Sequence, residues 1–201
     1  TSPYEIKESY QQTEKFLDNS KLDDRKKKGQ YFTPKVIKDA ALDQIDIFDG
    51  AKILENSCGT GEFIYSILER NKNVDIDAYD IDPTMVAICQ NQFPSVNSQV
   101  YNFLELDHKP IYDYVIGNPP YFEYLKENMS ETIRNKFDPW LYGRPNIYAL
   151  FIKASIDCLV EGGKLVFVVP KSINNGQHFK KFREFIIENC NILNMSFYNA
   201  N

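Results

Sequence analysis

Residues 53–63 read Ile-Leu-Glu-Asn-Ser-Cys-Gly-Thr-Gly-Glu-Phe and carry the pattern that decides the fold. A short apolar strand at 52–55 leads into a Gly-x-Gly turn, and a helix is expected from about 62 to 70. Glycines at such a turn let the backbone bend sharply and approach a ligand closely. We therefore interpret this stretch as the first strand, turn and helix of an α/β domain that binds a ligand where the strand ends.

The same alternation of strand and helix continues along the chain. Further strands are expected at 74–80, 99–103, 112–117, 164–169 and 192–197, and further helices at 34–45, 83–92, 146–160 and 179–188. Gly162 and Gly163 are expected to end the helix at 146–160. Nearly continuous apolar strands that alternate with helices predict an α/β fold, with a mostly parallel sheet and helices on both of its faces.

The N-terminal part of the chain is expected to lie outside this sheet. Apolar spacing at 4–17 favours a helix, and a polar linker follows, so residues 1–28 are assigned to these two elements. The basic cluster at 25–28 is either a solvated part of the linker or a phosphate contact. The main domain, residues 29–201, is expected to open on a helix with Thr33 as its N-cap.

Composition and cysteine spacing exclude several classes of protein. With 201 residues, 43% of them hydrophobic, the chain has enough apolar residues to bury a core. A net charge of -5 excludes a bulk polycation, so nucleic-acid contact needs a local basic patch. The 4 cysteines are widely separated and there are 2 histidines, which disfavours disulfides and metal sites and favours a cytoplasmic protein. No apolar run is long enough to span a bilayer, so no membrane partner is expected.

Residues 118–121, Asn-Pro-Pro-Tyr, follow the strand expected at 112–117. Proline cannot continue a ladder, so the main-chain carbonyl of Asn118 or Pro119 is expected to accept a hydrogen bond. The Asn118 side chain offers a second acceptor, and two neighbouring acceptors suit an amino group that carries two hydrogens. Tyr121 is placed to stack on a flat molecule. The pattern predicts a site that methylates an exocyclic or amide nitrogen.

Acidic residues at the ends of two strands suggest what the glycine turn binds. Glu55 repels phosphate and suits a cation such as the amino group of an amino acid. Asp80 lies about 20 residues beyond the turn and suits both hydroxyls of a ribose, whereas Asp82 is expected to cap the next helix. A pocket for a ribose and an ammonium group, without phosphates, fits S-adenosylmethionine.

Two further features leave alternatives open. Asn102 and Phe103 either contact an adenine ring or are a turn residue and a core aromatic. A nicotinamide site is an imperfect alternative, because the third glycine of the dinucleotide fingerprint is replaced by Ile64. The long stretch 122–145 is interpreted as a lid or substrate contact, with one or two solvated helices as the alternative.

Taken together, the motifs resemble the gamma class of DNA N6-adenine methyltransferases. The resemblance covers about residues 28–197, and the Gln-Tyr-Phe-Thr-Pro box makes it more specific than Asn-Pro-Pro-Tyr alone. It implies a Rossmann-like S-adenosylmethionine-dependent methyltransferase fold, with residues 29–201 as the catalytic domain. The motifs that carry it, in order, are Gly29-Gln30-Tyr31-Phe32-Thr33-Pro34, Glu55-x-x-Cys58-Gly59-x-Gly61, Asp80-Ile81-Asp82-Pro83, Asn118-Pro119-Pro120-Tyr121, Asn146-Ile147-Tyr148 and Val168-Val169-Pro170.

The resemblance also implies roles for individual residues. Asn118 and the Pro119 carbonyl would bind N6 of a target adenine on which Tyr121 stacks, and the catalytic set is Asn118, Pro119, Pro120 and Tyr121. The implied cofactor contacts are Tyr31, Thr33, Glu55, Ser57, Cys58, Gly59, Gly61, Asp80, Ile81, Asn102, Phe103 and Asn118.

Three departures from the family pattern stand out. Position 56 is Asn where the family often has Pro, and position 102 is Asn where it usually has Asp, which loses a charge-assisted hydrogen bond. The expected sheet ends after its sixth strand, where the family continues with a last strand and a target-recognition domain. Double-stranded DNA is therefore expected to be recognised mainly outside this chain, with a restriction or specificity subunit as a further partner.

Two other functions compete with DNA adenine methylation. A protein-glutamine or ribosomal RNA amino-group methyltransferase can share Asn-Pro-Pro-Tyr, but the box at 30–34 argues against it. A non-catalytic scaffold subunit that binds S-adenosylmethionine is the second alternative.

Overall fold

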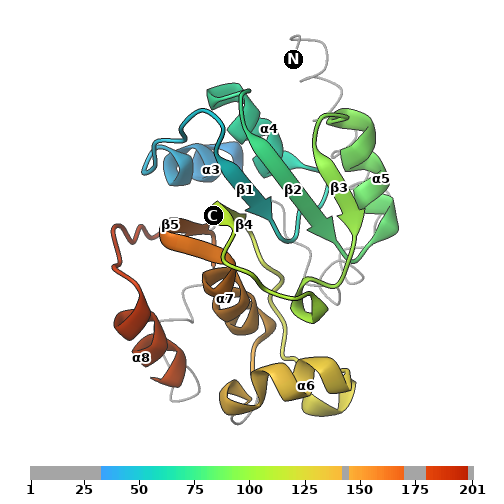
Figure 1. The fold of residues 1–201 in the computed structure, drawn as a ribbon, viewed down its shortest axis with the longest axis vertical. Helices are drawn as coiled ribbons and strands as arrows, with labels where there is room; N and C mark the ends of the chain where they lie inside the picture. The colour runs from blue at the N-terminus through green and yellow to red at the C-terminus, as the bar shows by residue number, and fades with distance from the viewer. Residues whose placement is uncertain (1–32, 142–144, 170–179, 199–201) are drawn as a thin grey trace.

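The computed structural model describes residues 33–141, 145–169 and 180–198 (Figure 1). The helix and linker expected at 1–28, and Tyr31 of the cofactor set, lie outside these residues. Within them, no helix is both long enough and apolar enough to cross a membrane.

A five-stranded parallel sheet forms the centre of the molecule, in the order β3-β2-β1-β4-β5. The predicted parallel α/β fold is confirmed. The strands are β1 (Lys52–Glu55), β2 (Asp75–Asp80), β3 (Asn97–Val100), β4 (Tyr112–Gly117) and β5 (Leu159–Phe167). Because all neighbours are parallel, the carboxyl ends of β1, β2 and β4 lie at one edge of the sheet, where such folds bind their ligands.

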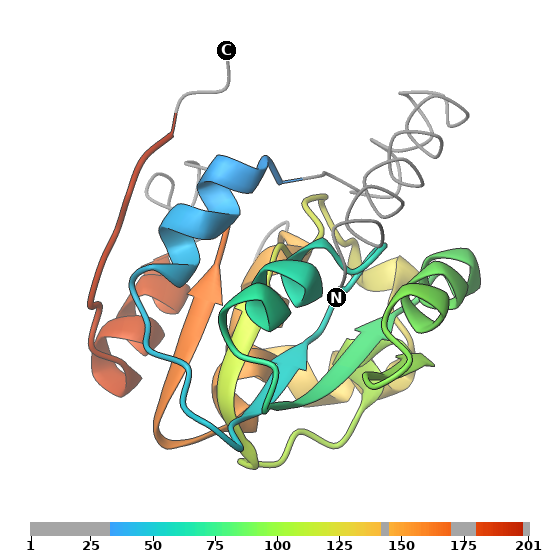
Figure 2. The same cartoon turned by 90° about the horizontal axis from the view of Figure 1, so that it is seen from above.

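Helices cover both faces of the sheet (Figures 1 and 2). They are α3 (Lys35–Leu42), α4 (Glu62–Arg70), α5 (Pro83–Gln92), α6 (Glu131–Phe137), α7 (Ile147–Cys158) and α8 (Lys180–Asn189). Successive residues of a strand point to opposite faces, so Ile53 packs in the core beneath α3, α4 and α5, while Leu54 packs in the core beside α6 and α7. The bounds of α4, α5 and β4 agree with the sequence, and Asp82 caps α5 by accepting from the N–H of Thr84.

The glycine pair in β5 corrects one prediction. Helix α7 ends at Cys158 and the chain enters β5 at once, so Gly162 and Gly163 lie inside the strand and do not end the helix. The pairing of β4 with β5 shifts register between Tyr112 and Tyr114, and Gly162 adopts a φ of 76°. A glycine inside a strand often marks such an irregularity, which is why the sequence signal was misread.

The strand predicted at 192–197 is also wrong. Residues 190–198 have no regular secondary structure and continue from α8 along one side of the molecule (Figure 2). Leu193 and Phe197 are 74% and 59% exposed. An apolar pattern gives a segment strand propensity, but a strand forms only when a neighbouring strand completes its hydrogen bonds. The third strand likewise begins and ends earlier than expected, and Phe103–Glu105 forms a 3₁₀ turn, η1.

The stretch 122–145 contains helix α6 flanked by two 3₁₀ turns, η2 (Lys126–Asn128) and η3 (Asp138–Trp140). Ile133 and Phe137 of α6 are buried in the core, and the Lys136 ammonium donates to the main-chain oxygen of Leu104 at 3.3 Å. The helical alternative therefore fits better in this part, although α6 is packed against the core. A substrate-contact role for 122–145 stays a prediction.

Gly61 joins the turn after β1 to α4 in a conformation that only glycine adopts readily. It is the N-cap of α4 with a φ of 89°. A methyl group at this position would lie 2.5 Å from Cε2 of the buried Phe93 ring. Backbone conformation and close packing thus both require glycine where the chain turns from sheet to helix.

We expect Gly61→Ala to lower the free energy of unfolding by about 1–3 kcal/mol, because it adds left-handed strain and a clash with Phe93. Gly50→Ala is the matched control, since Gly50 has a φ of 80° but nothing within 4 Å of an added methyl group. Urea denaturation measures the free energy of unfolding of both variants. The loss in Gly50→Ala reports backbone strain alone, and the additional loss in Gly61→Ala reports the clash with Phe93. Equal losses would show that the contact with Phe93 contributes nothing.

Candidate active site

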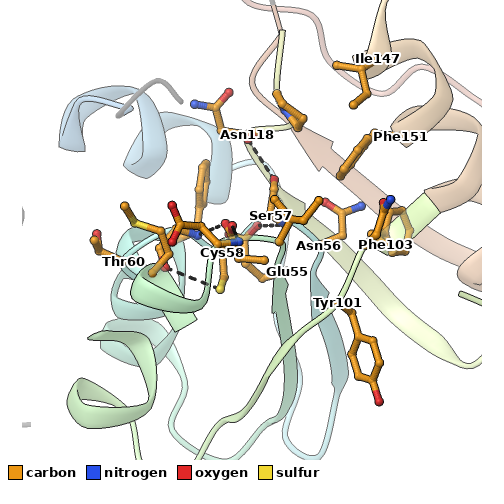
Figure 3. A pocket seen from close by; sticks show the side chains of 18 of the residues that line it. Glu55, Asn56, Ser57, Cys58, Thr60, Tyr101, Phe103, Asn118, Ile147 and Phe151 are labelled. Atoms are coloured by element: carbon orange, nitrogen blue, oxygen red, sulfur yellow. Dashed lines mark hydrogen bonds between the residues drawn. The ribbon is translucent and has the colours of Figure 1, made fainter. Parts of the chain in front are cut away.

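A cavity of about 560 Å³ opens where β1, β2 and β4 end (Figure 3). This volume lies within the range of small-molecule sites. Eleven predicted residues line it: Thr33, Glu55, Ser57, Cys58, Gly59, Asp80, Ile81, Asn102, Phe103, Asn118 and Pro120. Gly61, Pro119 and Tyr121, also predicted, are not among the lining residues.

The Glu55 carboxylate occupies space that a side chain at position 117 would fill. A methyl group on Gly117, the last residue of β4, would lie 2.4 Å from Glu55 Oε1. The glycine therefore makes room for the carboxylate, which also accepts weakly from the N–H of Ser57 at 3.4 Å. In the sequence, Gly117 is only the last residue of the strand expected at 112–117. Its role becomes visible when β1 and β4 are placed side by side.

Glu55 is buried without a salt bridge to any described residue. Burial raises the pKa of this carboxyl well above its ordinary value, and only the N–H of Ser57 and the charge of Lys38 act in the opposite direction. Lys38 is itself buried and pairs with Glu62, its ammonium 3.4 Å from the carboxylate. A cation that enters the cavity would supply the counter-charge that Glu55 lacks.

Asp80 connects the glycine turn to β2. Its carboxylate accepts from the N–H of Gly59 at 2.9 Å and from the N–H of Asp82 at 2.9 Å. Burial raises the pKa of Asp80, while these two N–H groups lower it. The carboxylate is therefore held rigidly at the cavity wall, where its remaining acceptor sites suit the two hydroxyls of a ribose.

Cys58 is a wall of the cavity and not a nucleophile. A hydrogen bond with Cys89 and burial raise the pKa of the Cys58 thiol well above its usual range. A neutral thiol is neither a good nucleophile nor a metal ligand. Within the described residues, no cluster of three or more His, Cys, Asp or Glu side chains is arranged to hold a metal ion.

The structure supports part of each interpretation of Asn102 and Phe103. Asn102 caps η1 by accepting from the N–H of Leu104 at 3.3 Å, as a turn residue would, and Phe103 is 2% exposed in the core. Both nevertheless line the cavity, and Phe103 packs against Phe151 with ring centroids 5.4 Å apart. Ile81 is 68% exposed at the rim.

Asn118 forms hydrogen bonds through its side-chain amide and its main-chain oxygen. Its amide nitrogen donates to the Thr33 hydroxyl at 2.8 Å, and its side-chain oxygen accepts from the Tyr121 hydroxyl. Its main-chain oxygen accepts from the Ser57 hydroxyl at 3.0 Å. The Tyr121 hydroxyl also contacts the main-chain oxygen of Val168. These contacts join residues 33, 57 and 118 into one edge of the cavity.

Several lining residues were given no role from the sequence. Ile147 and Phe151 lie one helical turn apart on α7 and present an apolar wall, and Phe122 and Tyr124 extend it. The i, i+4 spacing of the first two was a usable signal. Asn56, noted only as a departure from a family pattern, also lines the cavity.

Comparison with known proteins identifies the family. The model of the Eco57I restriction-modification methylase family matches residues 8–201. The chain belongs to this family. Membership agrees with the resemblance drawn from the motifs, in that both identify a restriction-modification methylase. The family match does not by itself specify the gamma class or methylation of adenine.

Named relatives of this Eco57I-family chain include modification methylase CviBIII of Paramecium bursaria Chlorella virus NC1A, which is 32% identical over 169 residues. The match covers 81% of this chain and 43% of the relative. Type II methyltransferase M.AccI of Acinetobacter calcoaceticus is 31% identical, over 83% of this chain and 32% of the relative. The chain thus spans less than half the length of these two proteins.

Solved structures agree on the fold. The type I restriction-modification system methyltransferase subunit of Streptococcus thermophilus aligns with a TM-score of 0.61 at 15% identity, over 79% of this chain and 38% of that one. A SAM-dependent O-methyltransferase of Thermotoga maritima aligns with a TM-score of 0.52 at 17% identity, over 78% and 51% of the two chains. The Eco57I-family chain therefore has the Rossmann-like methyltransferase fold.

We expect Glu55→Gln to stabilise the ligand-free protein at neutral pH by about 1 kcal/mol or more. Because burial raises the pKa of Glu55, the folded protein keeps a proton that the unfolded chain releases as the pH rises above the ordinary value of 4.5. Wild-type stability therefore falls with rising pH relative to the variant. Urea denaturation between about pH 5 and about pH 8 measures this difference.

The same variant is expected to weaken binding of a ligand with an ammonium group by about 10-fold or more. Glu161→Gln, at an exposed position, is the control and should change neither property. A Glu55→Gln protein that binds as well as the wild type would refute the ammonium site.

Proposed function

We propose that this chain is the catalytic part of a DNA methyltransferase that transfers a methyl group to N6 of adenine. The observation that supports this most strongly is the pairing of two sites at one edge of the sheet. A buried carboxylate suited to an ammonium group adjoins an Asn-Pro-Pro-Tyr segment suited to an amino group. The family match and the names of the relatives support DNA as the substrate.

S-adenosylmethionine is the cofactor, and it supplies an electrophilic methyl group. The cavity fits it in three respects: its volume, the buried Glu55 carboxylate for an ammonium group, and the Asp80 carboxylate for ribose hydroxyls. The glycine turn lacks the lysine that binds triphosphates in a P-loop. This absence is consistent with a ligand without phosphates.

The methyl acceptor is bound by residues 118 and 119. The main-chain oxygen of Asn118 already accepts from Ser57, so it contributes less than the sequence suggested. In the described part of the chain the Pro119 carbonyl has no protein donor, and it forms the second acceptor beside Asn118 Oδ1. Hydrogen bonds to these two oxygens draw electron density onto the amino nitrogen and aim its lone pair.

Tyr121 positions the amide and contacts the base. Its hydroxyl binds Asn118 Oδ1 and the Val168 carbonyl, which holds the ring beside the acceptor site. A target base must leave the duplex to reach this site, and the ring is then available for stacking. Displacement at the methyl group is direct, and the methylated amino group afterwards loses one proton to solvent.

The wider setting follows from the family. We also propose a restriction-modification role and a cytoplasmic location. In this proposal the DNA sequence is recognised by regions beyond this chain. A restriction or specificity subunit is a further proposed partner, since the aligned Streptococcus protein is a subunit of a type I system. The family match favours DNA over the glutamine and ribosomal RNA alternatives, and the intact 118–121 segment favours an enzyme over a scaffold.

We expect Asn118→Ala in the full-length protein to lower methyl transfer to DNA by about 100-fold or more, because one acceptor of the target amino group is lost. The variant should still bind S-adenosylmethionine. Titration calorimetry measures this binding, with NAD as the negative-control ligand. Transfer is followed with a radiolabelled methyl group, and nucleoside analysis of the DNA should show N6-methyladenine.

The control is Asn91→Ala, at an exposed position of α5, which should transfer normally. Methylcytosine as the product would overturn adenine specificity. Simultaneous loss of binding and folding in Asn118→Ala would assign Asn118 a structural role.

A further inference from the structure

Asn56 places a buried amide at the floor of the cofactor cavity. It directly follows β1, is 2% exposed and lines the cavity beside Ser57 and Phe103 (Figure 3). Glu55 and Asn56 are successive residues with different neighbours: the Glu55 carboxylate lies against Gly117 at the end of the adjacent strand β4, and the Asn56 amide reaches Ser155 on α7. The strand end thus directs two polar side chains to different parts of one cavity.

The orientation of the Asn56 amide is set by Ser155. The Ser155 hydroxyl donates its only proton to the main-chain oxygen of Phe151 at 2.6 Å, so its oxygen can only accept from Asn56. The Asn56 amide nitrogen donates to the Ser155 hydroxyl oxygen at 2.8 Å. A flipped amide would bring two acceptors together. The oxygen Oδ1 must therefore point away from Ser155.

Asn56 Oδ1 is buried and accepts no hydrogen bond from the described residues. A buried acceptor without a donor costs free energy, and such groups in folded proteins nearly always find a partner. Because this atom belongs to a residue that lines a ligand cavity, a bound ligand is the natural source of the missing donor.

The surroundings of Asn56 select the donor. Its cavity neighbours Phe103 and Phe151 are apolar rings that suit a flat base, whereas the ribose hydroxyls are served by Asp80. The exocyclic amino group of an adenine carries two hydrogens. Asn102, which directly precedes Phe103 and also lines the cavity, is a further candidate acceptor for one of them, although its Oδ1 already accepts from the N–H of Leu104.

We propose that Asn56 Oδ1 accepts a hydrogen bond from the 6-amino group of the cofactor adenine. Asn56 is then a specificity-determining residue that favours a 6-amino purine over a 6-oxo purine. The inference rests on the cofactor part of the proposed function and is independent of the methyl acceptor. In the gamma class that the sequence resembles, this position is often proline, which has no side-chain acceptor, so the contact is a property of this chain.

The test compares two ligands that differ at one position. S-adenosylhomocysteine has the 6-amino group, and S-inosylhomocysteine has an oxygen in its place. Titration calorimetry with the full-length protein measures both dissociation constants for the wild type and for Asn56→Leu. We expect the variant to bind S-adenosylhomocysteine about 5-fold to 10-fold more weakly and S-inosylhomocysteine within about 2-fold of the wild type.

Each result of this comparison decides the proposal. Equal weakening for both ligands would assign Asn56 a structural role, and no weakening for either would show that Oδ1 meets no ligand donor. Both outcomes would overturn the proposal without affecting the assignment of S-adenosylmethionine as the cofactor. A wild-type protein that binds neither ligand would overturn the cofactor assignment as well.

A second variant tests the same contact without changing Asn56. Ser155→Ala removes the group that sets the amide orientation, so the amide can turn its nitrogen toward the ligand and donate to a 6-oxo group. The preference for S-adenosylhomocysteine over S-inosylhomocysteine should then shrink relative to the wild type. An unchanged preference, with thermal unfolding showing a folded protein, would overturn the proposal.

Discussion

The active site depends on a carboxylate that occupies the place of a missing side chain. Glu55 ends β1 and Gly117 ends β4, and any larger residue at 117 would force the carboxylate to shift. This contact fixes the spacing between the ammonium site on one strand and the Asn118 segment on the next. The parallel pairing of β1 with β4 therefore places the proposed ammonium site beside the proposed amino-group site.

This arrangement buries polar side chains around the cavity, and their burial lowers the stability of the folded protein. Glu55 is buried without a salt bridge to any described residue, burial raises the pKa of Asp80, and Asn56 Oδ1 has no donor among the described residues. Burying each of these polar groups costs free energy. Together they are complementary to an ammonium group, ribose hydroxyls and an amino group. In the proposed complex, cofactor binding would relieve the cost of their burial and so stabilise the fold.

Local signals predicted most of the fold because they act over a few residues. The apolar runs at β1, β2 and β4, the left-handed turn at Gly61 and the cap at Asp82 follow from steric and hydrogen-bonding rules within one turn of chain. The errors occurred where the outcome depended on distant partners. Gly162 was read as a helix stop, and the segment 192–197 as a strand, because pairing with another strand cannot be read from local pattern.

The sequence by itself determined the parallel α/β fold and the positions of Glu55, Asp80 and the Asn118 segment at strand ends, since strand ends and glycine turns are local features. Only the tertiary structure decided how these groups are used. It showed that Gly117 makes room for Glu55, and that the partner of Asn56 is Ser155, a residue on α7. The physical reason is that hydrogen-bond satisfaction and packing depend on which residues meet in space, not on their separation along the chain.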